Sequence, residues 1–353
     1  MGLSRYLASW AVRRPHVLLA EVPGWWHTRV AVERAADDRG WRLAVSPADA
    51  DVLVTCGRPG ARLAEAVDRV WDQLPGPRAR VTVTDLEAAP ALDAAARWLL
   101  DDERQVLDAR SRRSPARGDV EPPGHAHHHA MTAPAGIPLA GERDDRDGLR
   151  LDALHLPLGP VLPQWPAGLV LHCALHGDVV ADAEVETLHG VADAAATPPF
   201  PRAAALDAAA RLLALTGWND AAATARRLRD LVLDARSEPE HLARRIDQLR
   251  ARVTRSRLLR WLLRGLGTVD TETLRRHRLP TTARGDVHDR LAAILTRAAA
   301  GLRGEAEPTE NDPGAVRAAL PAIVTGLELG AVRLVVASLE PDITTLRSEP
   351  SRG

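Results

Sequence analysis

The sequence contains no lysine, only two cysteines, one phenylalanine and one tyrosine, and no apolar run long enough to cross a membrane. Two cysteines cannot build a disulfide framework or a four-thiolate metal site, which favours a reducing compartment. The charges nearly cancel, with 46 basic against 47 acidic residues, so no basic field is available to hold nucleic acid. We therefore expect a cytoplasmic protein that binds no nucleic acid and has no membrane span of its own.

The first part of the chain alternates short apolar runs with amphipathic segments. The apolar runs predict four buried strands, at residues 16–22, 41–45, 51–56 and 81–84. The segments beside them predict three helices, at residues 30–39, 60–74 and 87–100. Such alternation is typical of a doubly wound parallel sheet. We predict a flavodoxin-like α/β domain over residues 1–107.

The pattern changes after this domain. Residues 108–148 are rich in Arg, Pro and His and predict a flexible linker. Residues 151–185 read as extended, with a hairpin turn at Gly177 and Asp178. Beyond them the sequence predicts five helices and a last short strand, at residues 203–215, 219–235, 239–264, 286–301, 314–328 and 334–337. We predict an α-rich domain with a β-hairpin entry over residues 149–345.

Several segments of the first domain resemble one protein family. They are Asp49–Thr55, Leu63–Ala66, Val70–Pro77 and Val81–Val83. In this order they are similar to the cluster-bearing small subunit that respiratory complex I shares with the membrane-bound [NiFe]-hydrogenases. The resemblance implies a flavodoxin-like fold and a place in an ion-translocating membrane complex.

The second domain resembles the large subunit that pairs with this small subunit. The similar segments are Gly159–Pro163, Gly168–Leu171, Gly177–Val180, Arg257–Gly267, Arg284–Val287 and Val335–Pro341. The chain therefore resembles a fusion of the two core hydrophilic subunits. The partners that this implies are other subunits of a complex I-like or antiporter-like membrane complex.

The residues that carry electrons in this family are missing. Its first cluster cysteines correspond to Gly24–His27 here, and the next one to Asp85 and Leu86. Iron–sulfur clusters need thiolate ligands, and Cys56 matches none of the ligand positions. A lone cysteine at a strand end is typically a small buried apolar residue. We expect no iron–sulfur cofactor. Because Cys173 is the only cysteine of the second domain, the paired cysteines that bind nickel in hydrogenases are also missing.

The quinone-side loop of the large subunit is also altered. At the position of its two histidines this chain has the loop that contains Leu162, Trp165 and Pro166. A quinone head group needs a hydrogen-bonding partner, which Leu and Pro side chains do not supply. We predict that Trp165 is buried at a contact between the two domains and fills the place of the quinone chamber.

Three other features of the sequence are candidates for a site. The histidines His125, His127, His128 and His129 can bind a transition metal, although a solvated tract explains them as well. In the helix at 239–264, Arg252, Arg255 and Arg260 are candidates for binding a partner, and no aromatics interleave with them as a nucleic-acid site would require. Thr55–Gly60 opens a helix as phosphate loops do, but lacks their glycine spacing.

The sequence leaves three classes of function open. The first is a structural subunit without redox activity that docks on a complex I-like membrane complex and lies in the cytoplasm or, through its partners, at the membrane. The second is a subunit of an NADH–quinone oxidoreductase that still takes part in electron transfer or quinone binding. The third is a metal-handling protein that uses the histidine cluster. Because the missing residues are those that carry electrons, we favour the first, with no enzyme activity in the chain alone.

Overall fold

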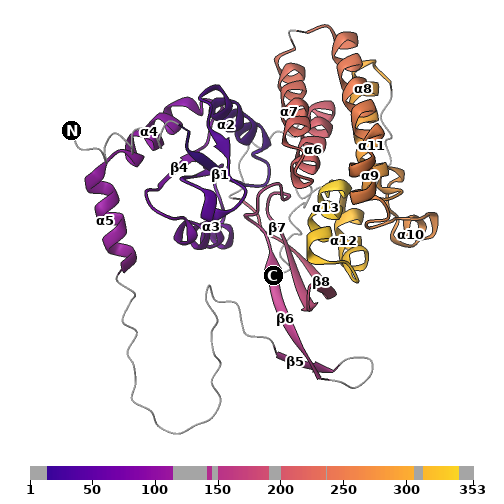
Figure 1. The fold of residues 1–353 in the computed structure, drawn as a ribbon, viewed down its shortest axis with the longest axis horizontal. Helices are drawn as coiled ribbons and strands as arrows, with labels where there is room; N and C mark the ends of the chain where they lie inside the picture. The colour runs from indigo at the N-terminus through magenta and orange to yellow at the C-terminus, as the bar shows by residue number, and fades with distance from the viewer. Residues whose placement is uncertain are drawn as a thin grey trace, which may run out of the picture. The chain divides into compact units, whose positions relative to one another are not determined.

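The computed structural model describes residues 14–113, 141–144, 150–190, 200–235, 237–305 and 313–341. These residues form two compact units (Figure 1). The first unit contains residues 14–113 together with 161–163 and 188–190, and the second contains the other described residues. The sequence places 161–163 and 188–190 in the second domain, but they group with the first. Within the described ranges, no helix is long and apolar enough to cross a membrane.

The first unit is built on a four-stranded parallel sheet. Its strands are β1 (His16–Glu21), β2 (Arg42–Leu43), β3 (Val52–Cys56) and β4 (Ala79–Val83). Their order in the sheet is β2-β1-β3-β4, and β1 pairs in parallel with both β2 and β3. This order matches the first four strands of a flavodoxin-like sheet. The predicted α/β fold class is confirmed.

Helices cover both faces of this sheet. They are α2 (Trp26–Asp38), α3 (Ala61–Gln73) and α4 (Ala89–Leu99), with a 3-10 turn, η1, at Pro47–Asp49. Figure 1 shows α3 across the sheet from α2 and α4. Val32 and Ala36 of α2 and Leu92 of α4 are buried in one cluster with the strand residues. The apolar face of each helix therefore packs on the sheet, as the sequence predicts.

A fourth helix, α5 (Asp102–Arg113), corrects the linker prediction at residues 108–113. The side chain of Gln105 accepts a hydrogen bond from the backbone N–H of Arg78 and donates one to its carbonyl, both at 3.0 Å. The Arg78 guanidinium also pairs with Asp108 at 2.9 Å. These contacts fasten α5 to the start of β4. The composition of this segment is that of a linker, and its partner lies 30 residues earlier.

The second unit begins with an antiparallel sheet. Its strands are β5 (Gly141–Asp144), β6 (Arg150–Leu158), β7 (Leu169–His176) and β8 (Val179–Thr187), and they lie side by side in chain order. The predicted hairpin turn joins β7 to β8, where Gly177 has a φ of 64°. The predicted β-hairpin entry is thus part of a four-stranded meander.

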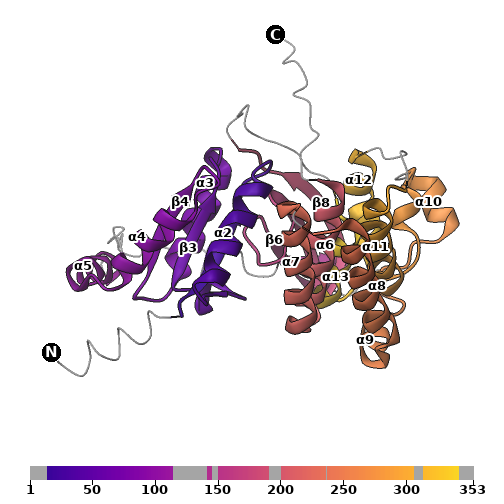
Figure 2. The ribbon, with the colours of Figure 1, turned by 90° about the horizontal axis from the view of Figure 1, so that it is seen from above.

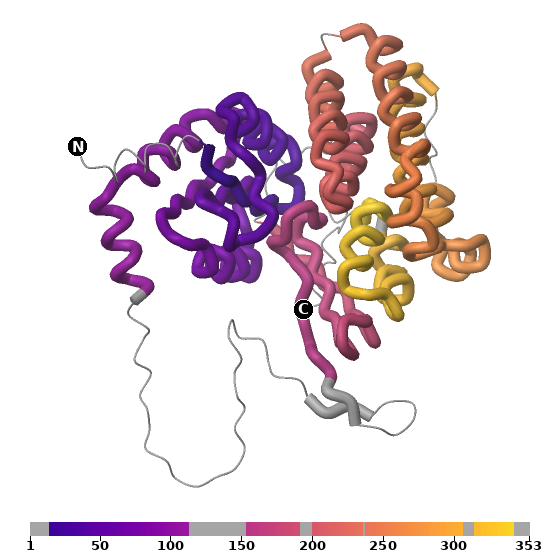
Figure 3. The backbone as a smooth tube through the Cα atoms, in the orientation of Figure 1, coloured from indigo at the N-terminus to yellow at the C-terminus, as the bar shows by residue number. Residues whose placement is uncertain are grey.

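Eight helices follow in the described part of this unit, and Figure 3 traces the chain through them. They are α6 (Pro201–Leu215), α7 (Asn219–Asp234), α8 (Pro239–Arg255), α9 (Arg257–Leu263), α10 (Thr271–His277), α11 (Val287–Leu302), α12 (Pro313–Val324) and α13 (Leu329–Leu339), with a 3-10 turn, η3, at Thr281–Ala283. Alanines fill much of the contact between α6 and α7, which keeps the two backbones close. Asp207 of α6 pairs with the buried Arg229 of α7 at 2.7 Å. The predicted α-rich region is confirmed.

Two predicted elements of this region were wrong in detail. The helix predicted at 239–264 is broken, because Ser256 has an extended backbone and its side chain accepts a hydrogen bond from the N–H of Leu259 as the cap of α9. The strand predicted at 334–337 lies inside α13 instead. Val332, Val335, Val336 and Leu339 are all buried, and their helical spacing places them on one face of α13. Packing of that face overrides the strand preference of the valines.

Arg290 of α11 holds the turns around it together. Its side chain is fully buried, and it donates hydrogen bonds to the Ser338 hydroxyl and to the carbonyls of Gly267, Ala283 and Gly285 at 2.6 to 3.3 Å. Burial lowers the pKa of Arg290 to about 10, so the guanidinium remains charged at neutral pH. One cation therefore donates to three backbone carbonyls of the surrounding turns, and those of Gly267 and Ala283 are buried.

Replacing Arg290 should destabilise the second unit. We expect Arg290→Met to lower its free energy of unfolding by about 3 kcal/mol or more, because the carbonyls of Gly267 and Ala283 lose this donor while remaining buried. Thermal and urea unfolding followed by circular dichroism measure this change.

Arg284→Met is the matched control, since Arg284 is exposed beside the same turn and should change stability by less than about 0.5 kcal/mol. Equal effects of the two variants would contradict the role assigned to Arg290.

Candidate functional site

The carboxyl ends of the parallel strands are the natural place to look for a site in the first unit. In open α/β sheets, ligands bind in the crevice outside these strand ends. Here β1 ends at Glu21 and β3 ends at Cys56, and these residues are opposite each other in the sheet. The loops that follow them form the edge where a cofactor of a flavodoxin-like domain would lie.

An indole ring fills this edge. Gly57 follows β3 with a φ of 107°, and a Cβ at this position would overlap the ring of Trp25. The Trp25 side chain is buried, with Trp25 only 7% exposed, and the backbone N–H of Trp25 donates to the carbonyl of Val22 at 3.0 Å. The loop after β1 thus folds back and lays Trp25 on the loop after β3. The predicted resemblance matches this segment to the first cluster cysteines of the family.

A buried ion cluster lies at the same strand end. Arg29 of α2 pairs with Glu21 at 2.6 Å and also with Glu33, and these side chains are 6 to 11% exposed. Burial, and next the negative charge of Glu21, raise the pKa of the Cys56 thiol far above its usual range. Because only the thiolate binds metal or attacks, Cys56 is held in its inert form.

The segment after β8 covers the edge further. The N–H of Gly60 donates to the carbonyl of His189 at 3.1 Å, and Pro59 forms an antiparallel bridge with Gly190. The N–H of Gly57 donates to the carbonyl of Val83 at 2.8 Å. A phosphate loop needs such backbone donors directed at the ligand. In the loop at 55–60 two of them are engaged in backbone pairing.

The loop of the predicted quinone position is packed within the chain. Trp165 is 5% exposed, and its indole N–H donates to the carbonyl of Leu169 at 2.8 Å. A Cβ at Gly159 would clash with the same ring, whereas Leu162 and Pro166 are half-buried. The structure agrees with the prediction that Trp165 is buried. Its place at a contact between the domains stays a prediction.

The predicted partner-binding arginines differ from one another. Arg252 pairs with Asp220 at 2.9 Å and lies 5.0 Å from the centre of the Trp218 ring. Arg260 donates to the carbonyl of Thr254, and Arg255 is exposed without an acidic partner in the described chain. Of these three arginines, Arg255 and Arg260 offer a charge that no carboxylate of the described chain balances.

The metal prediction at His125, His127, His128 and His129 lies outside the described residues. Inside them, Asp286, His288 and Asp289 bring three possible ligand atoms within 4.8 Å of one another. Asp286 caps α11, however, and it also accepts a hydrogen bond from the N–H of Gly265 at 2.8 Å. Both carboxylates form the capping box of this helix. Their arrangement is explained by the helix end.

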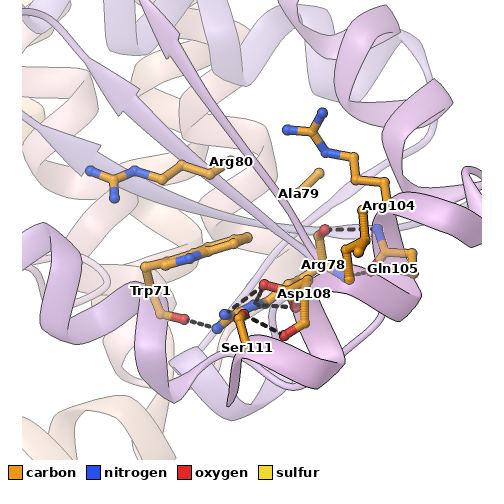
Figure 4. A pocket seen from close by; sticks show the side chains of 9 residues that line it. Trp71, Arg78, Ala79, Arg80, Arg104, Gln105, Asp108 and Ser111 are labelled. Carbon is orange, nitrogen blue, oxygen red and sulfur yellow. Dashed lines mark hydrogen bonds and ion pairs between the residues drawn. The ribbon is translucent and has the colours of Figure 1, made fainter. Parts of the chain in front are cut away.

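A pocket of about 360 Å³ opens between β4 and α5, and Figure 4 shows its lining. The Arg78 guanidinium lies 3.9 Å from the centre of the Trp71 ring and binds Asp108, while Arg80 pairs with Asp68. Arg104 stacks on Trp98 at 4.2 Å. The most buried polar groups of this pocket are thus already paired, and they hold α5 on β4. A second pocket, of about 320 Å³, lies between α10 and α12 and is lined by Thr273, His277 and Ile323 among others.

In comparison with known proteins, no protein-family model matches the sequence, and no curated protein is significantly similar to it.

The indole packing can be tested with two glycines of the first unit that both have positive φ. We expect Gly57→Ala to reduce stability by about 1–3 kcal/mol more than Gly40→Ala, because only Gly57 faces a ring that the new methyl group would strike. Urea unfolding of both variants measures the difference. Equal losses would show that Trp25 does not rest on Gly57.

The thiols should be unreactive in the folded chain. Burial raises the pKa of Cys173 to about 11, so only about one thiol in a thousand is ionised at pH 8, and the fraction rises with pH. Both cysteines are buried. Reaction with Ellman's reagent at pH 8 should therefore require denaturant. Rapid modification of one thiol per native chain would contradict this assignment.

Proposed function

We propose that the chain is a structural subunit without redox activity, which docks on a membrane complex related to complex I. The observation that carries this proposal is the filled carboxyl edge of the parallel sheet. Trp25 rests on Gly57 there, and the ion pair between Arg29 and Glu21 lies beside it. Packing and paired charges occupy the place where a cofactor of this fold binds.

The partner class rests on the ordered resemblance described above. The resembling segments coincide with packing elements of this chain, among them β3, α3, β4, β7 and α13. The residues that differ from the family are those of the cluster and the quinone loop. This division favours a subunit that keeps its shape and contacts and has lost electron transfer. We propose that it lies in the cytoplasm and reaches the membrane through its partners.

Metal analysis tests the absence of a redox centre. Protein purified without oxygen should contain far less than one iron and one acid-labile sulfide per chain, because no cluster ligand set is present. Its spectrum should be featureless near 400 nm, roughly the region where iron–sulfur clusters absorb.

Cys56→Ser is the matched control for this measurement. Its iron content should equal that of the unchanged chain. Stoichiometric iron that disappears in Cys56→Ser would overturn the proposal and favour an electron-transferring subunit of an NADH–quinone oxidoreductase.

The partner class has a separate test. The tagged full chain should be expressed in its natural host, crosslinked and purified, and the copurifying proteins identified by mass spectrometry. The proposal expects membrane subunits of the complex I or antiporter type. Recovery of the chain without any such subunit would overturn the docking role.

A further inference from the structure

The short helix α9 exposes a group of large apolar side chains. Leu258 and Trp261 are 73% and 78% exposed, and Leu262 is 39% exposed. Their spacing of three and four residues places them on one face of the helix. Leu259 and Leu263 on the adjoining face are buried and hold α9 to its own unit. Figure 2 shows α9 at the lower edge of this unit.

The same segment carries uncompensated positive charge. Between Gln248 and Val269 there are six arginines and no acidic residue. The four that flank the apolar face, Arg255, Arg257, Arg260 and Arg264, are exposed, and none has an acidic partner in the described chain. Together with Leu258, Trp261 and Leu262 they form what we call the α9 patch. It combines protruding apolar side chains with a net charge of one sign.

Trp261 differs from the other tryptophans that the structure describes. Four of them, Trp25, Trp26, Trp41 and Trp165, are buried. Trp71, Trp98 and Trp218 are half-buried, and each lies under an arginine. Among these eight rings, Trp261 alone is exposed and has no arginine stacked on it. Because most of the Trp261 ring stays in water, its apolar surface contributes little hydrophobic free energy to folding.

The size of the patch favours a lipid surface over a protein partner. A stable protein interface buries about 800 Å² on each side. A helix of seven residues is only about 10 Å long, so the exposed face of α9 covers a small part of such an area. An anionic bilayer needs no matching shape. Its headgroups attract each arginine, and Trp and Leu side chains enter the boundary between headgroups and acyl chains.

We propose that the α9 patch binds the surface of membranes that contain anionic phospholipids. Trp261, Leu258 and Leu262 insert at the headgroup level, and the four arginines bind lipid phosphates. This contact is a property of the chain itself and does not rest on the proposed docking to membrane subunits.

Flotation of the purified full chain with vesicles tests this proposal. The chain should float with phosphatidylcholine vesicles that contain 30% phosphatidylglycerol, at lipid concentrations of about 1 mM or below. It should not float with pure phosphatidylcholine vesicles. Raising the salt concentration from 50 to 500 mM should weaken the binding strongly, because screening shortens the reach of the arginine charges.

Two variants separate the parts of the patch. The triple variant Arg255→Gln, Arg257→Gln and Arg264→Gln should reduce the partition coefficient roughly 100-fold. Trp261→Ser should reduce it about tenfold or more and remove the blue shift of tryptophan fluorescence that vesicles cause. The matched control, Arg275→Gln, Arg276→Gln and Arg278→Gln, makes the same charge change at the exposed end of α10 and should bind as the unchanged chain does.

Three results would overturn the proposal. They are failure of the unchanged chain to float with anionic vesicles, equal losses in the α9 and α10 triple variants, and full binding by Trp261→Ser. Sedimentation in the absence of lipid reveals one competing occupant. If the chain does not float and self-associates, and Trp261→Ser abolishes the association, the patch is a contact between two copies.

Discussion

A buried guanidinium must find acceptors for its N–H groups, and this requirement organises both units. The chain has no lysine, and Arg29, Arg78, Arg229 and Arg290 are each at most 5% exposed. Arg78 fastens α5 to β4, and Arg229 pairs with Asp207 to join α7 to α6. Because the planar group presents several donors in fixed directions, one arginine can tie together elements that are far apart in the sequence.

At the carboxyl edge of the parallel sheet, a buried arginine, Arg29, and its carboxylate partners lie where a cofactor of this fold would bind. A cofactor site needs open space and ligands in their reactive protonation state. Here Trp25 occupies the space, and burial beside Glu21 keeps the Cys56 thiol protonated. The packing of Trp25 stabilises the folded chain, since its apolar surface leaves water, and the buried Arg29 cation keeps its carboxylate partners. The residues at this edge, Trp25 and Cys56, are thus part of the buried core of the first unit.

Local pattern predicted most of the first unit but not the long-range contacts that define its edge. The four strands and three helices follow from apolar periodicity, which each segment carries by itself. The helix α5 depends on the pairing of Asp108 with Arg78, and the cover of the edge on the pairing of Pro59 with Gly190. Neither pairing leaves a trace in composition. In α13, packing against the neighbouring helices decided against the strand that its valines favour.

Two of the predicted partner-binding arginines, Arg255 and Arg260, lie beside the exposed apolar side chains of α9. Five of the seven residues of α9 are Leu or Trp, too many to be buried on one face of so short a helix. Ser256 is a typical N-cap residue and marks the start of α9 as a separate helix. Water surrounds Leu258, Trp261 and Leu262 in the folded chain, so their burial requires an apolar phase from outside. The guanidinium groups beside them restrict that phase to one with a negative surface, because their charge is balanced by nothing in the described chain.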